Sequence, residues 1–368
     1  MALKIVKSGA AYSKITGIGE KVRKLEQETG EKYLYLNQGV NAVCNIKLNE
    51  VVKLIDFNSR DIQVYPPMKG RPVLKEAINE DYFNSKSNAG NILITGGGMS
   101  GLDLVFQTID VENFYLPTYF WGSYFNILTI RKKTAGFYES YDFLKKNINK
   151  FKNSAVVICD PNNPIGDKFN DKDLTELINN LADAGAVVII DSPYRKVFFD
   201  KDLFYENVCF NENVILVESF SKSIGLSGQR IGFIHSVNND FIDELTIRLM
   251  YSTNGINGFA QLLVEKIYTT KEGKKAATEF KQTTRSDIKK NIDYLKTRGF
   301  IAGEFFNNSQ EMGIFTVVNL SEEFLLQHKI ASVSLSFFTR KNKEYASNFS
   351  RICVSVPHDK LKTYFDKI

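Results

Sequence analysis

The sequence is short of histidine and cysteine, and it contains no long apolar run. Its 368 residues include three histidines and four cysteines, which lie far apart rather than at the short spacings of metal ligands. We therefore expect no metal site and no histidine-based catalytic triad, and we expect free, buried thiols. No apolar run approaches the roughly 18 residues that a membrane span needs, and the N-terminal "MALKIVKSGAAYSKI" lacks the apolar stretch of a signal peptide. These absences predict a cytoplasmic protein without a membrane partner.

The charge of the chain is nearly balanced. Lysine and arginine number 47 against 42 acidic residues, a net charge of +5, and so mild an excess argues against a nucleic-acid partner. A hydrophobic content of 43% and a charged content of 24% are ordinary for a soluble globular protein. The length is sufficient for two domains.

The middle of the chain alternates short apolar runs with helical patterns. The runs "SAVVICD", "AVVIIDSPY" and "VILVESFSKS" are nearly continuous in valine and isoleucine, as in strands of a parallel sheet that helices cover on both faces. This pattern predicts a large α/β domain over residues 45–260. After it come a long helix over 271–298 and short strands in "GIFTVVNL" and "RICVSV". We expect residues 1–44 and 261–368 to form a small discontinuous α+β domain.

Polar side chains and glycines follow several of the predicted strands, where ligands bind in open α/β sheets. A glycine run over 96–98 opens a helix after "NILIT", which lets the backbone approach an anion. Asn163 stands between two prolines after "SAVVIC", and Asp191 follows "AVVII" with Tyr194 three residues later. Taken alone, the glycine run is also typical of a plain connection, and Asn163 of a proline-asparagine turn. Asp191 alone could equally be an acidic metal ligand.

The segment "SFSKSIGLSGQRIG" gives the sharpest signal. Lys222 is flanked by Ser219 and Ser221, and Arg230 follows eight positions later. Hydroxyls and a guanidinium suit a buried phosphate dianion, and a neighbouring positive charge lowers the pKa of the lysine amine, which makes it a better nucleophile. A phosphate cradle, an acid, a phenol, an amide and one amine are together what pyridoxal 5'-phosphate requires. The competing interpretation is an unrelated sugar-phosphate or nucleotide binder in which Lys222 only contacts phosphate.

From "YPPMKGRPVLKEAI" to "RICVSV" the chain resembles the class I/II aminotransferase family of fold-type I pyridoxal-phosphate enzymes. The resemblance implies a seven-stranded, mostly parallel sheet, a pyridoxal 5'-phosphate cofactor and a homodimer with shared active sites. It also implies transfer of an amino group from an amino acid to a keto or aldehyde acceptor.

The same resemblance implies roles for individual residues. Lys222 would carry the internal aldimine and move the α-proton, Asp191 would pair with the pyridine nitrogen, and Tyr194 and Asn163 would donate hydrogen bonds to the ring oxygen. The phosphate would be held by the backbone or side chains of Gly98, Met99, Ser219, Ser221 and Arg230. Tyr119 would stack on the ring, although Phe120 and Trp121 follow it directly and either could take that place.

The substrate side of the site is implied less sharply. Arg351 would clamp the α-carboxylate, with Arg340 as a rival, and Gly39 and Asn163 would lie beside the substrate. Tyr65 would reach the phosphate of the neighbouring subunit. The pocket is expected to draw on the N-terminal segment, and no second arginine is assigned to a distal carboxylate.

Other chemistries share the same cofactor residues. A decarboxylase, a C–S or C–O lyase and a cyclising synthase all remain alternatives to transamination. An aminotransferase-like bacterial regulator is disfavoured, because the resemblance begins within about the first forty residues and no basic recognition helix precedes it.

Overall fold

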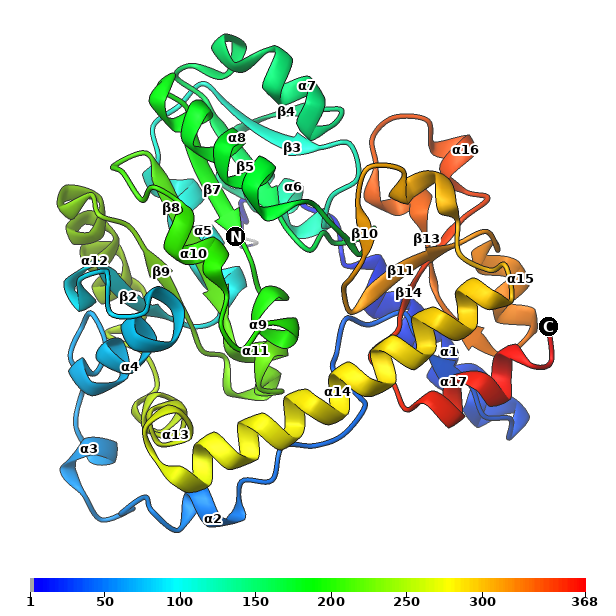
Figure 1. Cartoon of the computed structure of the whole chain (residues 1–368), viewed down its shortest axis with the longest axis horizontal. Helices are drawn as coiled ribbons and strands as arrows, with labels where there is room; N and C mark the ends of the chain where they lie inside the picture. Colours follow the sequence, from blue (N-terminus) through cyan, green and yellow to red (C-terminus); the bar gives the residue numbers. More distant parts are fainter. Residues whose placement is uncertain (1–2) are drawn as a thin grey trace.

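The computed structural model describes residues 3–368, and a seven-stranded sheet forms its centre (Figure 1). The strands are β2 (Ile92–Thr95), β3 (Asn113–Pro117), β4 (Thr134–Tyr138), β5 (Ala155–Cys159), β7 (Val187–Asp191), β8 (Val214–Ser219) and β9 (Gly232–His235). Their order is β2-β9-β8-β7-β5-β3-β4, and only β9 runs antiparallel to its neighbours. The prediction of a mostly parallel α/β sheet is confirmed.

Helices pack on the sheet in two groups. One group is built around α5 (Gly98–Thr108), which contacts α6 (Gly122–Ile130) and α12 (Asn239–Thr253). The other is built around α8 (Asp171–Asp183), which contacts α7 (Tyr141–Lys146) and α10 (Leu203–Asn207). Because both faces are covered, β5 and β8 are buried along their whole length, which explains their unbroken apolar sequences.

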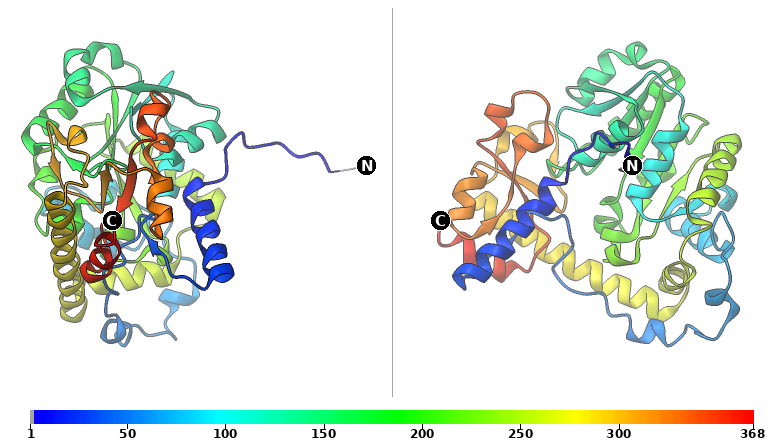
Figure 2. Two further views of the ribbon diagram at one scale, coloured as in Figure 1. Left: turned by 90° about the vertical axis from the view of Figure 1, so that its right-hand side faces the viewer. Right: turned by 180° about the vertical axis from the view of Figure 1, so that it is seen from behind.

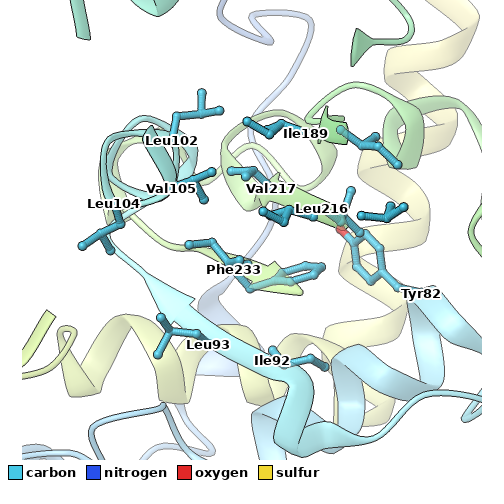
Figure 3. Close-up of a cluster of buried hydrophobic side chains, with 14 of the residues drawn as sticks. Tyr82, Ile92, Leu93, Leu102, Leu104, Val105, Ile189, Leu216, Val217 and Phe233 are labelled. Carbon is cyan, nitrogen blue, oxygen red and sulfur yellow. The ribbon is translucent and has the colours of Figure 1, made fainter. Parts of the chain in front are cut away.

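A close-up of the core shows how α5 meets the sheet (Figure 3). Leu102 and Val105 of α5 lie beside Val217 of β8, and Phe233 of β9 lies close by. All four side chains are fully buried, and each such burial is worth about 1.5–3 kcal/mol. This packing holds the first turn of α5 against the carboxyl end of β8, where the polar loops begin.

A smaller unit lies beside the sheet (Figures 1 and 2). Its antiparallel sheet has the order β11-β14-β13, formed by β11 (Phe315–Val318), β14 (Ser350–Cys353) and β13 (Val333–Ser334). Helix α1 (Lys14–Thr29) packs on this unit, and β1 (Leu34–Tyr35) pairs with β12 (Ile330–Ala331). The helix predicted over 271–298 is α14 (Lys271–Thr297), which runs from the large unit to the small one in Figure 1.

The other helices and strands belong to one of these units or to the segments between them. They are α2 (Asn49–Val52), α3 (Arg60–Gln63), α4 (Pro72–Phe83), β6 (Asp167–Lys168), α9 (Arg195–Phe198), α11 (Phe220–Ser223), α13 (Gly258–Thr269), β10 (Gln310–Glu311), α15 (Glu322–Gln327), α16 (Lys343–Ala346) and α17 (His358–Phe365). No helix within residues 3–368 is long and apolar enough to cross a membrane.

The packing of α14 bears on the division into domains. Ala276, near its start, belongs to the large core, whereas Ile288 and Leu295 belong to the core of the small unit. Leu263 of α13 also packs in the large core. We therefore propose that the boundary lies within α14 rather than at residue 260.

Candidate active site

The carboxyl ends of β5, β7 and β8 meet the first turn of α5 around a cavity of about 440 Å³. Its lining includes all of the predicted site residues except Tyr65 and Tyr119. The predicted residues that line it are Gly39, Gly98, Met99, Asn163, Asp191, Tyr194, Ser219, Ser221, Lys222, Arg230 and Arg351. Arg351 and Gly39 come from the small unit and its neighbouring loop, so the cavity lies between the two units.

Lys222 lies in α11, directly after β8, with its amine inside the cavity. The pKa of this amine is lowered to about 8, chiefly by burial; Cys353 opposes the shift, and the positive charges of Arg230 and Arg351 contribute to it. About a tenth of the amine is therefore neutral at pH 7, compared with well under a hundredth for an ordinary lysine. The pKa of Lys222 is thus lowered, as the sequence predicts, and burial is the main cause.

Asp191 ends β7 and is buried with one hydrogen-bond donor in the described chain, the phenol of Tyr124. Burial raises the pKa of Asp191 to about 7, and the Tyr124 hydrogen bond opposes this rise. Sequence reasoning did not find Tyr124, because it lies within the apolar run of α6 and has the pattern of a core residue. No cationic side chain within residues 3–368 pairs with this buried carboxylate.

Two glycines at the start of α5 pack against two serines and an arginine, and Gly98, Ser219, Ser221 and Arg230 line a part of the cavity called the hollow below. A Cβ at Gly97 would lie 2.8 Å from Nη2 of Arg230, and a Cβ at Gly98 would lie 3.3 Å from Cβ of Ser219. The Ser219 hydroxyl donates to Oγ of Ser221 at 2.9 Å, and Nη1 of Arg230 donates to the same Oγ at 3.4 Å. Backbone N–H groups, hydroxyls and a guanidinium therefore face one space, as binding of a phosphate requires.

Arg351 of β14 connects the small unit to the sheet. Its side chain is 1% exposed, and its guanidinium lies 4.2 Å from the ring centroid of Phe315. Nη1 donates to Oδ1 of Asn163 at 3.1 Å, Nη2 donates to the carbonyl of Asn37, and Nε has no partner in the described chain. Asn163 in turn donates from Nδ2 to the Tyr194 oxygen at 3.1 Å. Two of the five guanidinium N–H groups are thus engaged, and the remaining ones, with the phenolic proton of Tyr194, have no acceptor in the described chain.

Two further predictions concern the same end of the cavity. A Cβ at Gly39 would overlap Cζ of the Phe315 ring, so only glycine fits there. Arg340, the rival of Arg351, stacks on the ring of Phe125 at 4.1 Å and does not line the cavity.

Of the three consecutive aromatic residues 119–121, Trp121, which directly precedes α6, is the one that lines the cavity. Tyr119 lies outside the lining, where it pairs with Thr339 and packs 5.5 Å from the ring of Phe305. The structure therefore favours Trp121 over Tyr119 as the ring beside the ligand. Tyr65 is 80% exposed and lies away from this cavity, and its predicted role at a neighbouring subunit stays a prediction.

Several lining residues carry no signal in the sequence. Ser13, Ile15 and Thr16 come from the start of α1, and Gln38 and Val40 come from the loop after β1. They are unremarkable in composition, and only the fold brings them to the cavity. In residues 3–368, no group of three or more His, Cys, Asp or Glu side chains is arranged to hold a metal ion.

Comparison with known proteins identifies the family. The family described as aminotransferase class I and II matches residues 31–368, so the chain belongs to it. A probable aspartate/prephenate aminotransferase of Aquifex aeolicus is 25% identical over 81% of this chain and 80% of its own length. A histidinol-phosphate aminotransferase of Buchnera aphidicola is 30% identical over 54% of this chain and 57% of its own length.

Solved structures share the fold. Aspartate aminotransferase from Thermus thermophilus, solved with maleate, superposes with a TM-score of 0.82 at 17% identity over 99% of both chains. An aminotransferase from Mycobacterium tuberculosis gives 0.83 at 16% identity over 100% of this chain and 98% of that one. The chain is an aminotransferase with the fold-type I architecture. A decarboxylase, a lyase or a cyclising synthase is not favoured.

Proposed function

We propose that this aminotransferase uses pyridoxal 5'-phosphate, bound in the cavity at Lys222, to move an amino group from an amino acid to a keto or aldehyde acceptor. The observation that carries the proposal is that Lys222, Asp191 and the group formed by Gly98, Ser219, Ser221 and Arg230 line one cavity. An amine, a carboxylate and a phosphate cradle are thus available to a single ligand.

The residues present fit this cofactor. The hollow at the start of α5 suits a phosphate, and a side chain at Gly97 or Gly98 would crowd it. Asp191 is buried without a cation, and a protonated pyridine nitrogen would supply the missing charge. Trp121 at the cavity wall offers a flat face for the ring.

When bound, the cofactor supplies an aldehyde that condenses with amines and a ring that withdraws electrons from the substrate α-carbon. Lys222 would act as base and acid, taking the proton from the substrate α-carbon and delivering it to the carbon of the cofactor's aldehyde group. Arg351 would hold the α-carboxylate through its unengaged N–H groups, and Gly39 leaves room for the Phe315 ring that packs against this guanidinium. Asn163 and Tyr194, which share a hydrogen bond, would donate toward the ring oxygen, and Met99 in the first turn of α5 would contribute a backbone N–H to the phosphate.

The first test locates the cofactor. Borohydride reduction of the protein with pyridoxal phosphate, followed by peptide mass spectrometry, should find the adduct on Lys222 and none in Lys222→Ala. The matched control is Lys281→Met, because Lys281 is also buried with its pKa lowered to about 8 but lines a different cavity. This control should retain the adduct. An adduct on Lys281, or none in the wild type, would refute the proposed site.

The second test identifies the reaction. With an amino acid, the cofactor spectrum should change to that of its amino form while a keto acid appears, and an added keto acid should reverse the change. Release of carbon dioxide or ammonia with the original spectrum restored would instead indicate a decarboxylase or a lyase.

We further propose a homodimer with shared active sites. Tyr65 and Tyr251 are 80% and 84% exposed, and their segments are neighbours, because a Cβ at Gly255 would lie 3.2 Å from Pro66. The segment before α1 extends away from the body in Figure 2, with Val6 94% exposed. Such exposed apolar side chains support a contact with a second copy.

Sharing of the sites can be measured by mixing subunits. Lys222→Ala and Tyr65→Ala are each expected to be impaired as pure proteins. Their equal mixture should regain about a quarter of wild-type activity, because half of the dimers would hold one intact site. No recovery in mixtures shown to exchange subunits would argue against the role of Tyr65.

Action in the cytoplasm also stays a prediction, supported by four free cysteines.

A further inference from the structure

A second cavity, of about 330 Å³, lies between the large and the small unit. The large unit contributes the ends of β3 and β4 and part of the loop from Asn162 to Phe169, and the small unit contributes residues 304–309. Its lining shares no residue with the lining of the cavity at Lys222. The two cavities are nevertheless neighbours, because Asn162 lines the second cavity and Asn163 lines the active site.

Five aromatic rings line the second cavity. The ring centroids of Tyr119, in the large unit, and Phe305, in the small unit, lie 5.5 Å apart with the rings edge to face. The ring centroid of Tyr141 lies 4.3 Å from that of Phe169 and 6.3 Å from that of Tyr138. Rings of this kind attract organic cations through the negative potential of their faces.

Asp167 places a carboxylate in the same wall. It begins β6, which pairs with β10 of the small unit. Its Oδ1 is buried and has no hydrogen-bond partner within residues 3–368, and the neighbouring Lys168 donates instead to Asp171 at 2.7 Å. Burial, together with the negative charge of Asp160, raises the pKa of Asp167 to about 7. A cation beside Asp167 would therefore stabilise its ionised form.

The rest of the lining agrees with a cationic ligand. Glu139 of the large unit and Glu304 of the small unit add two more carboxylates, one on each side of the boundary between the units. A water molecule occupies about 30 Å³ of the liquid, so the cavity has room for about ten non-hydrogen atoms. Nowhere in residues 3–368 are three His, Cys, Asp or Glu side chains arranged to hold a metal ion. Size, charge and aromatic character together favour a small organic cation.

The proposed contact with a second subunit lies in another part of the molecule. Tyr65 directly follows α3, which is at the lower left of Figure 1, whereas β10 and α7 beside the second cavity are in its upper half. Neither Tyr65 nor Tyr251 lines this cavity.

We infer that the second cavity binds a small organic amine in its protonated form, with an N–H group on Asp167 and its alkyl part among the aromatic rings. The inference goes beyond the proposed function and does not depend on it, because no residue that serves the cofactor lines this cavity. The bound amine would touch both units and the loop that places Asn163 in the active site.

The test uses N,N-dimethylbutylamine as the probe. Its protonated form has one N–H group, and as a tertiary amine it cannot condense with the aldehyde of pyridoxal phosphate. Calorimetry on the protein loaded with pyridoxal phosphate should show one site per chain, with a Kd below about 1 mM. The neutral N,N-dimethylbutanamide should bind at least about tenfold more weakly, because it lacks the charge-assisted hydrogen bond. Equal binding of the two compounds, or of neither, would overturn the inference, and so would displacement of the amine by an equal concentration of potassium chloride.

Variants assign the binding to residues. Asp167→Asn keeps the shape of the side chain and should weaken amine binding at least about tenfold. The matched control is Asp142→Asn, which removes an exposed charge of α7 that does not line the cavity and should leave the Kd unchanged. Phe305→Leu should weaken binding about two- to fivefold through the loss of one cation–π contact. Unchanged binding in Asp167→Asn would overturn the inference.

Thermal unfolding separates a ligand site from a structural role. Because the pKa of Asp167 is raised in the folded protein, its ionisation destabilises the fold above the ordinary pKa of an aspartate. Without amine, Asp167→Asn should therefore have a higher Tm than the wild type at pH 8. A lower Tm or a failure to fold would show that Asp167 has a partner in the folded protein and would overturn the inference. Dissociation of Asp167→Asn into monomers would do the same, since a second subunit would then supply the cation.

Discussion

Substituting Gly97 by alanine tests whether the start of α5 is shaped for an anion. Gly97 has φ +92° and ψ 171°, a combination essentially restricted to glycine, and another residue pays about 1–3 kcal/mol to adopt it. The new methyl group would lie 2.8 Å from Nη2 of Arg230, so the guanidinium must move. Loss of one hydrogen bond to a charged group weakens binding by about 1.5–3 kcal/mol. We therefore expect Gly97→Ala to raise the Kd for pyridoxal phosphate about 10- to 150-fold.

The assay for Gly97→Ala combines absorbance titration of the cofactor with thermal unfolding of the cofactor-free protein. A loss of 1–3 kcal/mol in a chain of this length lowers Tm by only about 1–4 °C, so the affinity is the more sensitive readout. Gly228→Ala is the matched control, because Gly228 is exposed in the same loop region as Arg230, and a methyl group added there would meet no atom within 4 Å. Wild-type affinity and Tm in Gly97→Ala would refute the assignment of this hollow to the phosphate.

Three more predictions concern the charged groups of the cavity. Tyr124→Phe should raise the pKa of Asp191 further, because the opposing hydrogen bond is lost. Absorbance titration should then show weaker cofactor binding, and the loss should be larger at pH 6 than at pH 8.5. An equal loss at both pH values would contradict this. Arg351→Lys should raise KM for amino donors about tenfold or more, since an ammonium cannot form the fork, while the cofactor spectrum stays unchanged; an unchanged KM would contradict the clamp. In cofactor-free protein, cyanate labelling of Lys222 followed by mass spectrometry should have its midpoint near the pKa of about 8; a midpoint near that of an ordinary lysine would contradict the effect of burial.

The sequence could predict those site residues that stand at strand ends. Asn163, Asp191 and Lys222 each follow a nearly unbroken apolar run, and such runs in a parallel sheet end at one edge. The predicted strand ends therefore implied that these three side chains lie close together in the fold. Arg351 was named through the family resemblance alone, because nothing in "RICVSV" states which cavity its strand faces.

The residues that the sequence did not reveal depend on packing between elements. Trp121 rather than Tyr119 lines the cavity, and α6 begins directly after it. The start of this helix determines which of the three consecutive aromatic side chains faces the cavity. Tyr124 donates its hydrogen bond from inside an apolar helix. Asn37 contributes a carbonyl, which every residue type possesses. These contacts arise from the placement of α6 and of the loop after β1, and no local pattern encodes them.

The cavity holds opposite charges that do not neutralise each other. Asp191 and Lys222 both line it, yet no ion pair joins them within the described chain. Had they paired, each would stabilise the charged form of the other, lowering the pKa of Asp191 and raising that of Lys222. Both pKa values move the opposite way, because burial dominates at each group. Both groups are therefore open to a ligand. In the proposed function a cationic ring nitrogen meets Asp191, an aldehyde meets the neutral amine of Lys222, and an anionic tail meets Arg230. This combination fits a pyridinium with a phosphate tail better than it fits any simple anion.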